Sequence, residues 1–219
     1  MITYKDIVND HKVRTLIEHA DKSLIALGYT EHSYAHVGMV SKRAEYILST
    51  LGYSEREIEL VKIAAFMHDI GNVVNRKDHS QSGAVMAFRI LDTLGMDPEE
   101  TAMIVTAIGN HDEGEGEAVS PLAAALIIAD KTDVRRTRVR NNDITSFDIH
   151  DKVNYSVIKT DVTINDAKTE IELKLENDTE ISPVVSYFEI FLKRMIMCRK
   201  AAQKLGLNFK LVVNNQQLM

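Results

Sequence analysis

The sequence predicts a mainly α fold: a helical bundle over residues 1–150, followed by a small α+β appendage over residues 151–219. Only three prolines and ten glycines interrupt the 219 residues, and 45% of the residues are hydrophobic, as expected for a globular protein with long helices. Apolar side chains recur every three or four residues through the first part, which is the helical period. After residue 150, alternating β-branched residues indicate strands.

Capping residues divide the first half of the bundle into helices. An amphipathic segment over residues 12–27 forms the first helix, and Thr30 is expected to begin the second. The second helix ends near Gly52. Ser54 is followed three residues later by Glu57, the capping-box pattern that begins a third helix.

Three more helices are expected before residue 150. A polar turn over residues 71–78 precedes the fourth helix. Pro98 and Pro121 each follow a capping residue and begin the fifth and sixth helices, because proline suits the first helical position. An acidic loop over residues 112–117 separates these two helices.

The C-terminal appendage is predicted to be a ββαβ unit. Residues 155–164 and 170–175 alternate like the two strands of a hairpin. A long amphipathic helix begins at Pro183 and ends near Gly206, and residues 209–213 read as one more strand. Because an exposed edge strand needs covering, this unit favours a homodimer.

Composition excludes several classes of protein. The net charge of −6 argues against broad nucleic-acid binding, which depends on neutralising backbone phosphates. The single cysteine, Cys198, cannot form an intrachain disulfide and suits a reducing compartment. The polar N-terminus and the absence of a long apolar run predict a cytoplasmic protein without a membrane partner.

Metal-competent side chains lie on the apolar stripes of five different helices, close to helix ends. They are His36, His68, His79, His111 and Asp130. The helical period turns each of them toward a common core, where an imidazole or carboxylate is costly unless it is paired or bound to metal. One such histidine is usually a hydrogen-bonded core residue, but five on separate helices favour a metal site. Mixed imidazole and carboxylate ligands suit Mn, Fe, Ni, Co or Zn.

The ordered motifs resemble the HD superfamily of metal-dependent phosphohydrolases. The resemblance rests on AAFMHDIGN, a histidine in an earlier helix and ADKTD in a later one, and it spans about residues 20–140. It implies an HD-domain helical bundle whose metal ligands are His36, His68, Asp69 and Asp130. His32 fits the pattern of the first ligand less well than His36, so it is expected to support the ligands or bind substrate.

The resemblance also implies a second metal ion. His79 and His111 match the extra histidines of the two-metal subset of this superfamily, in which the aspartate corresponding to Asp69 bridges the ions. One or two ions per chain are therefore expected. The alternative is that His79 caps its helix and His111 faces solvent.

Two departures from the family pattern narrow the prediction. Asn72 stands where the family often has Lys or Arg, which weakens the case for a phosphate-binding cation at that position. The Gly-Tyr-Pro signature of cyclic-dinucleotide phosphodiesterases does not follow His111, which argues against that subgroup.

A basic cluster, KTDVRRTRVR, follows the expected ligand Asp130. Lys131, Arg135 and Arg136 are predicted to bind substrate phosphate, since guanidinium groups match phosphate oxygens bidentately. The alternative is a solvated helix end, where the helix dipole favours cations. Asp133, or else Asp112, is expected to orient the attacking water or protonate the leaving group.

Together these features predict a phosphomonoesterase or phosphodiesterase that hydrolyses a small phosphorylated substrate, a nucleotide by default, through metal-activated water. Asp69, Lys131 and Asp133 are the expected catalytic residues. Two alternatives remain open at this stage: a metal- and nucleotide-binding sensor with little turnover, and a di-iron oxygenase of the HD type.

Overall fold

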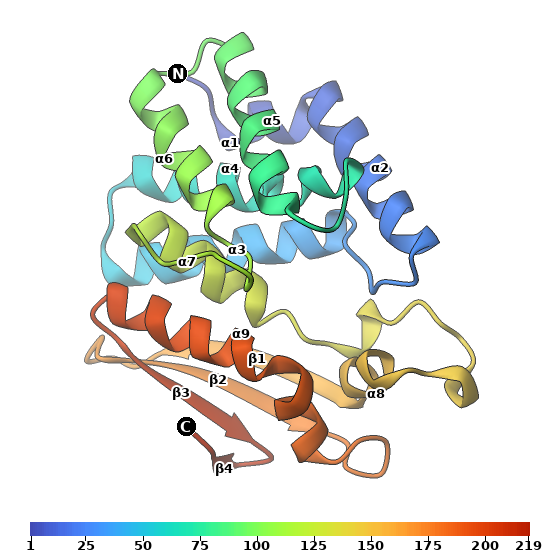
Figure 1. Ribbon diagram of the computed structural model, residues 1–219. Coiled ribbons are helices and arrows are strands. Elements are labelled where there is room, and N and C mark those ends of the chain that lie inside the picture. Colours follow the sequence, from blue (N-terminus) through green and yellow to red (C-terminus); the bar gives the residue numbers. More distant parts are fainter.

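The computed structural model describes residues 1–219 and shows a helical bundle packed on a small layered α+β unit (Figure 1). The helices of the bundle are α1 (Tyr4–Asn9), α2 (His11–Ala26), α3 (Tyr34–Leu51), α4 (Glu55–Met67), α5 (His79–Thr93), α6 (Pro98–Gly109) and α7 (Pro121–Lys131). The second unit consists of α8 (Ile149–Ser156), β1 (Val157–Ile164), β2 (Glu170–Asn177), α9 (Val184–Lys204), β3 (Asn208–Val213) and β4 (Gln216–Gln217). The predicted fold class is therefore confirmed.

The main correction to the helix boundaries lies at the start of α3. Ser33, not Thr30, is the N-cap, and its hydroxyl accepts from the backbone of Ala35. The preceding residues are held out of the helix because Asp21 accepts from the backbone N–H of His32, and Arg138 donates to the carbonyl of Glu31. The short helices α1 and α8 were not predicted.

Short 3-10 helices connect the longer elements. The first, η1 (Ile70–Val73), occupies the beginning of the segment predicted to be a polar turn. Two more, η2 (Arg136–Arg138) and η3 (Ile144–Ser146), lie between α7 and α8.

The four-stranded sheet has the order β1-β2-β3-β4. Strands β1 and β2 form the predicted antiparallel hairpin, and α9 connects β2 to its parallel neighbour β3. The inner face of β2 buries Ile171, Leu173 and Leu175 in the core cluster that also contains buried residues of α9. On the free side of β1, the backbone N–H of Ile164 donates to the hydroxyl of Tyr46 from α3. A homodimer stays a prediction.

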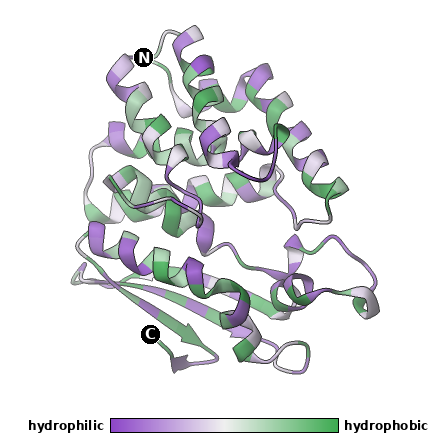
Figure 2. Cartoon of the chain, in the orientation of Figure 1, coloured by the Kyte–Doolittle hydropathy of each residue, from purple (hydrophilic) through white to green (hydrophobic).

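Helix α7 lies at the centre of the molecule. It contacts α3, α4 and α6 on the bundle side and α9 on the other side, and almost every one of its residues is buried. In Figure 2, hydrophilic and hydrophobic residues alternate along the helices that surround α7. One hydrophobic cluster of 49 buried residues runs from the bundle through α9 to the sheet, across the boundary expected at residue 150. None of the helices combines the length and apolar character needed to cross a membrane.

Candidate metal centre

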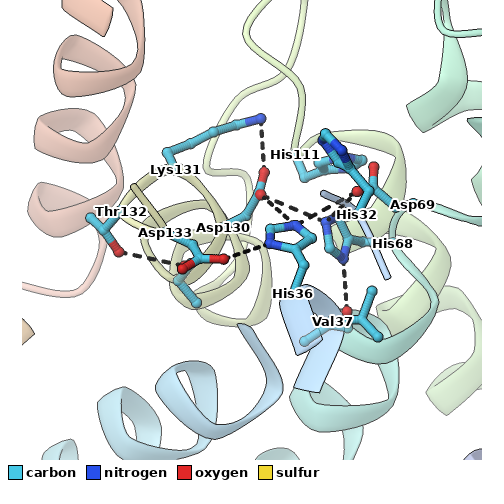
Figure 3. Close-up of polar contacts among 12 residues, drawn as sticks. His32, His36, Val37, His68, Asp69, His111, Asp130, Lys131, Thr132 and Asp133 are labelled. Carbon is cyan, nitrogen blue, oxygen red and sulfur yellow. Dashed lines mark hydrogen bonds and ion pairs between the residues drawn. The ribbon is translucent and has the colours of Figure 1, made fainter. Parts of the chain in front are cut away.

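The predicted ligands converge from the ends of separate helices. His36 lies near the start of α3, His68 and Asp69 follow α4, and Asp130 lies in the last turn of α7. The view in Figure 3 shows these four side chains turned toward one another. The side chains of His36 and His68 are fully buried, so the part of the site that these two histidines form lies in the protein interior.

The Nε2 atoms of His36 and His68 face the same two carboxylates. Nε2 of His36 lies 3.3 Å from Asp130 Oδ1 and 3.6 Å from Asp69 Oδ2. For His68 Nε2, the corresponding distances are 3.3 Å to Asp69 Oδ2 and 3.7 Å to Asp130 Oδ1. Neither Nε2 atom has a hydrogen-bond partner, although both are buried. Because an unpartnered buried polar atom is costly, two of them facing two carboxylates fit a shared metal ion.

The other ring nitrogens are fixed by the chain. Nδ1 of His68 donates to the carbonyl of Ala65 at 2.7 Å, and Nδ1 of His36 lies 2.8 Å from Asp133 Oδ2. A proton held on Nδ1 leaves the lone pair on Nε2, which is the tautomer that binds metal.

A second group of possible ligands adjoins the first. His79 and His111 are both 1% exposed, so neither faces solvent. Their Nδ1 atoms contact the carbonyls of Arg76 and Ile108, and their Nε2 atoms lie 3.1 Å apart. Two nitrogen lone pairs at this distance repel one another unless a cation lies between them. His79 Nε2 is also 3.4 Å from Asp69 Oδ1.

Asp69 stands between the two groups. Its Oδ2 faces His36 and His68, whereas its Oδ1 faces His79 and accepts from the side-chain amide of Asn72 at 2.8 Å. Geometry that can hold a metal occurs both for His36, His68 and Asp130 and for His68, Asp69 and His111. Asn72 therefore has a clear structural role: it orients this carboxylate.

The electrostatics of the site favour bound positive charge. Burial lowers the pKa of His68, but Asp69 and Asp130 outweigh it and raise that pKa to about 10. Burial lowers the pKa of His111 and His79. Despite burial, neighbouring positive groups hold the pKa of Asp69 and Asp130 well below the ordinary value. The ionised carboxylates of Asp69 and Asp130 therefore favour a cation beside the histidine Nε2 atoms.

A cavity of about 350 Å³ opens beside these ligands, with Asp69, His79 and Asp130 in its wall. The loop that follows α2 forms another wall. The remaining walls come from α8 and α9, so the C-terminal unit encloses part of the site. This volume lies in the range of small-molecule pockets, roughly 300–1,000 Å³.

Two other predicted residues, Lys131 and His32, also line this cavity. Lys131 is buried, and its Nζ lies 2.8 Å from Asp130 Oδ2 and 3.2 Å from Glu113 Oε2. It thus holds the ligand Asp130 in place. His32 lies just before α3, and its Nδ1 is 2.6 Å from the carbonyl of Thr30.

Asp133 does not lie in the cavity, where its predicted role in orienting the attacking water or protonating the leaving group would place it. It is 2% exposed, does not line the cavity, and contacts His36 on the ring nitrogen away from the carboxylates Asp69 and Asp130. Arg135 and Arg138 also pair with its carboxylate. It is therefore suited to position His36 rather than to face the cavity.

Arg135 and Arg136 also lie away from the cavity, contrary to prediction. The chain leaves the helix at Lys131, and the following turn directs both side chains elsewhere. Arg135 pairs with Asp133 and Glu31, while Arg136 donates to the carbonyl of Tyr155.

The cations that do line the cavity besides Lys131 are Arg76, Arg138 and Arg194, none of which was predicted to bind substrate. Arg76 follows Asn72 by four residues in the segment HDIGNVVNR. A basic residue so close to the metal-binding motif is a signal in the sequence from which its place at the site could have been predicted. Arg194 has no such signal, because its place depends on how α9 packs beside α7.

Residues 33–135, which include every proposed ligand, match the HD domain family. The chain is 27% identical over 203 residues to MJ1020, an uncharacterized protein of Methanocaldococcus jannaschii, with 81% of this chain and 78% of that protein covered. It is also similar to the crystal structure of a predicted HD superfamily hydrolase from an uncultured Thermotogales bacterium, with 25% identity, a TM-score of 0.45, and 57% and 67% of the two chains covered. Residues 33–135 therefore form an HD domain, the family whose model they match, and all the proposed ligands lie within it.

Proposed function

We propose that this protein is a metal-dependent phosphohydrolase that cleaves a phosphate ester of a small molecule, with nucleotides as the leading substrate class. One observation carries the proposal. The unpartnered Nε2 atoms of His36 and His68 face two carboxylates beside a cavity lined with cations. This arrangement can hold a divalent transition metal next to a bound phosphate.

When bound, such a metal lowers the pKa of a coordinated water, so that hydroxide is available near neutral pH. The chain supplies the rest of the site. Asp133 and the carbonyl of Ala65 hold the two histidine rings, and Asn72 holds Asp69. Lys131 keeps Asp130 ionised and adds positive charge to the wall of the cavity.

Hydrolysis forms a bond from the water oxygen to phosphorus and breaks the bond from phosphorus to the leaving oxygen, which takes up a proton. Neither predicted carboxylate lines the cavity, but Asp112 contacts two side chains that do, His79 and Lys131, so we assign this proton transfer to it. It is partly exposed, and its Oδ1 lies 3.9 Å from both His79 Nε2 and Lys131 Nζ. Asp133 is enclosed behind His36.

The cavity supports a nucleotide as substrate. Its wall carries the carboxylates of Asp148 and Asp151 and the amide of Asn154, all from the region of α8. These groups can accept hydrogen bonds from sugar hydroxyls or a base amino group. Tyr29, a half-exposed aromatic residue in the same wall, offers a face for a planar ring.

The first experiment measures metal content in untagged protein, together with hydrolysis of p-nitrophenyl phosphate and a nucleotide panel in Mn²⁺. We expect about two equivalents of metal in the wild type, about one in His79→Ala, and none with Asp69→Ala, because Asp69 faces both groups. His19→Ala removes an exposed histidine on α2 and serves as the matched control.

Three results would contradict the proposal. Protein that stays free of metal after reconstitution would remove the catalytic centre. Tight nucleotide binding without turnover would identify a sensor. Oxygen consumption that accompanies turnover would identify an oxygenase.

A further inference from the structure

Four cationic side chains line the cavity, and they differ in how many of their hydrogen-bond donors already contact other protein groups. They are Arg76, Lys131, Arg138 and Arg194. A cation whose donors are all occupied holds the structure, whereas a cation with free donors can bind a ligand. The hydrogen bonds of each one therefore show which can bind substrate.

In two of the four, Lys131 and Arg138, the hydrogen-bond donors already contact other groups of the protein. The ammonium group of Lys131 lies between Asp130 and Glu113. Arg138 donates from Nε and Nη2 to the carbonyl of Glu31 and from Nη1 to the carbonyl of Asp133. Both hold the walls of the cavity together.

Arg76 stands at the metal ligands. Its Nη1 lies 3.2 Å from Asn72 Oδ1, 3.4 Å from His79 Nε2 and 3.9 Å from Asp69 Oδ1. Arg76 therefore lies where it would contact the phosphate that is hydrolysed at the metal.

Arg194 is the remaining cation, and it comes from outside the HD domain. Its Nε lies 2.5 Å from Glu113 Oε1, and its guanidinium stacks over the ring of Phe191 at 4.5 Å. No hydrogen bond to the protein holds its two terminal nitrogens. Glu113 and Phe191 therefore fix the orientation of the guanidinium and leave one edge free, at 28% exposure of the side chain.

A chain of three ion pairs places Arg194 relative to the metal site. Asp130 pairs with Lys131, Lys131 with Glu113, and Glu113 with Arg194. The guanidinium thus stands in the same cavity as the ligand Asp130, displaced from it toward α9. An anion bound there would share the cavity with a phosphate at the metal.

We propose that Arg194 binds a second phosphate group of the substrate, so that the protein prefers phosphate esters that carry a second, adjoining phosphate, such as nucleoside diphosphates, over monophosphates. The inference rests on the proposed function for the first phosphate and names the substrate class. A free guanidinium edge matches two phosphate oxygens bidentately. The cavity volume of about 350 Å³ leaves room for both groups.

Calorimetry of the Mn²⁺-loaded protein tests this inference without relying on turnover. Free metal is removed by desalting, and inorganic pyrophosphate and orthophosphate are titrated separately. We expect Arg194→Ala to weaken pyrophosphate binding by about tenfold to a hundredfold, the usual effect of losing hydrogen bonds to a charged group. Orthophosphate binding should stay unchanged.

Two further variants sharpen the test. Arg194→Lys keeps the charge but not the fork, so it should recover only part of the loss. Arg199→Ala removes an exposed arginine from the same helix, outside the cavity, and should alter neither titration. Metal content after each titration shows whether pyrophosphate has extracted the ion.

Equal weakening of both anions in Arg194→Ala, or no weakening of either, would overturn the inference. If no substrate is hydrolysed but pyrophosphate binding still depends on Arg194, the hydrolase proposal fails and the second phosphate site stands. If phosphate esters are hydrolysed and Arg194→Ala leaves pyrophosphate binding intact, the reverse holds.

Discussion

One ring nitrogen of His36 faces the proposed metal site, and the other contacts the buried carboxylate of Asp133. Asp133 Oδ2 accepts from Nδ1 of this ring at 2.8 Å, and Arg135 and Arg138 keep the same carboxylate charged. Burial raises the pKa of Asp133, but His36 and the two arginines outweigh it, so that pKa lies well below the ordinary value. A permanently ionised carboxylate at this place makes the imidazole a better ligand.

We expect Asp133→Asn to weaken metal binding by about tenfold to a hundredfold, the usual cost of losing a carboxylate behind a ligating histidine. Competition against a chelator measures the affinity, and circular dichroism confirms that the variant is folded. Asp166→Asn, which changes an exposed aspartate in the β1–β2 turn, is the control. Wild-type affinity in Asp133→Asn would show that the pair has no role in metal binding.

The packing of η1 against α5 sets the distance between the two groups of ligands. A Cβ atom on Gly71 would lie 1.9 Å from the carbonyl oxygen of His79 and 2.5 Å from the backbone nitrogen of Gly83. Only a glycine allows this close approach of two backbones. It brings His79 beside Asp69, which immediately precedes η1.

Gly71→Ala should therefore lower the free energy of unfolding by about 1–3 kcal/mol, as overpacking does, and weaken metal binding at His79. Gly38→Ala on α3 is the matched control, since nothing lies within 4 Å of its added Cβ. Alanine there should raise stability by roughly 0.5–1 kcal/mol because it favours the helix. Urea unfolding of the metal-free proteins gives both values, and equal effects would refute the packing argument.

Among the helices and strands, the sequence predicted those whose positions follow from local patterns of residues. The capping box at Ser54 and the prolines that begin α6 and α7 are visible without tertiary information. The hairpin and the long helix α9 follow from their periods in the same way. The eight-residue α8 was missed because so short a helix has little periodicity of its own.

Within the site, the metal-competent side chains were predictable because each lies on an apolar stripe. The direction of a polar side chain at the end of a helix was not. Asp133 lies one turn from Asp130 in sequence, yet the chain leaves the helix between them, so the two carboxylates contact different nitrogens of His36. Arg194 entered the site only through the packing of α9 beside α7.

Across the whole molecule, Glu113 connects the C-terminal unit to the bundle. It pairs with Lys131 of α7 and with Arg194 of α9. Burial raises the pKa of Glu113, but these two cations outweigh it and hold that pKa well below the ordinary value of 4.5. Since the folded state lowers this pKa, the carboxylate stabilises the fold above pH 4.5, and the contribution is lost as the pH falls.

Glu113→Gln should therefore be less stable than the wild type at neutral pH, and the difference should shrink as the pH falls below 4.5. Urea unfolding of metal-free protein across this range measures it. Glu115→Gln, an exposed change in the same loop, should match the wild type throughout. A difference that stays constant with pH would exclude an ionised Glu113 as its source.

The cavity has walls from two separate stretches of the chain. All six proposed metal ligands fall within residues 33–135, whereas α8 and α9 lie beyond them. Substitutions in the later stretch can therefore change which molecule fits without disturbing the chemistry of the centre. Evolution could retune such a protein by altering or exchanging its C-terminal unit, and relatives that share the ligands but differ in α8 and α9 should have diverged in substrate.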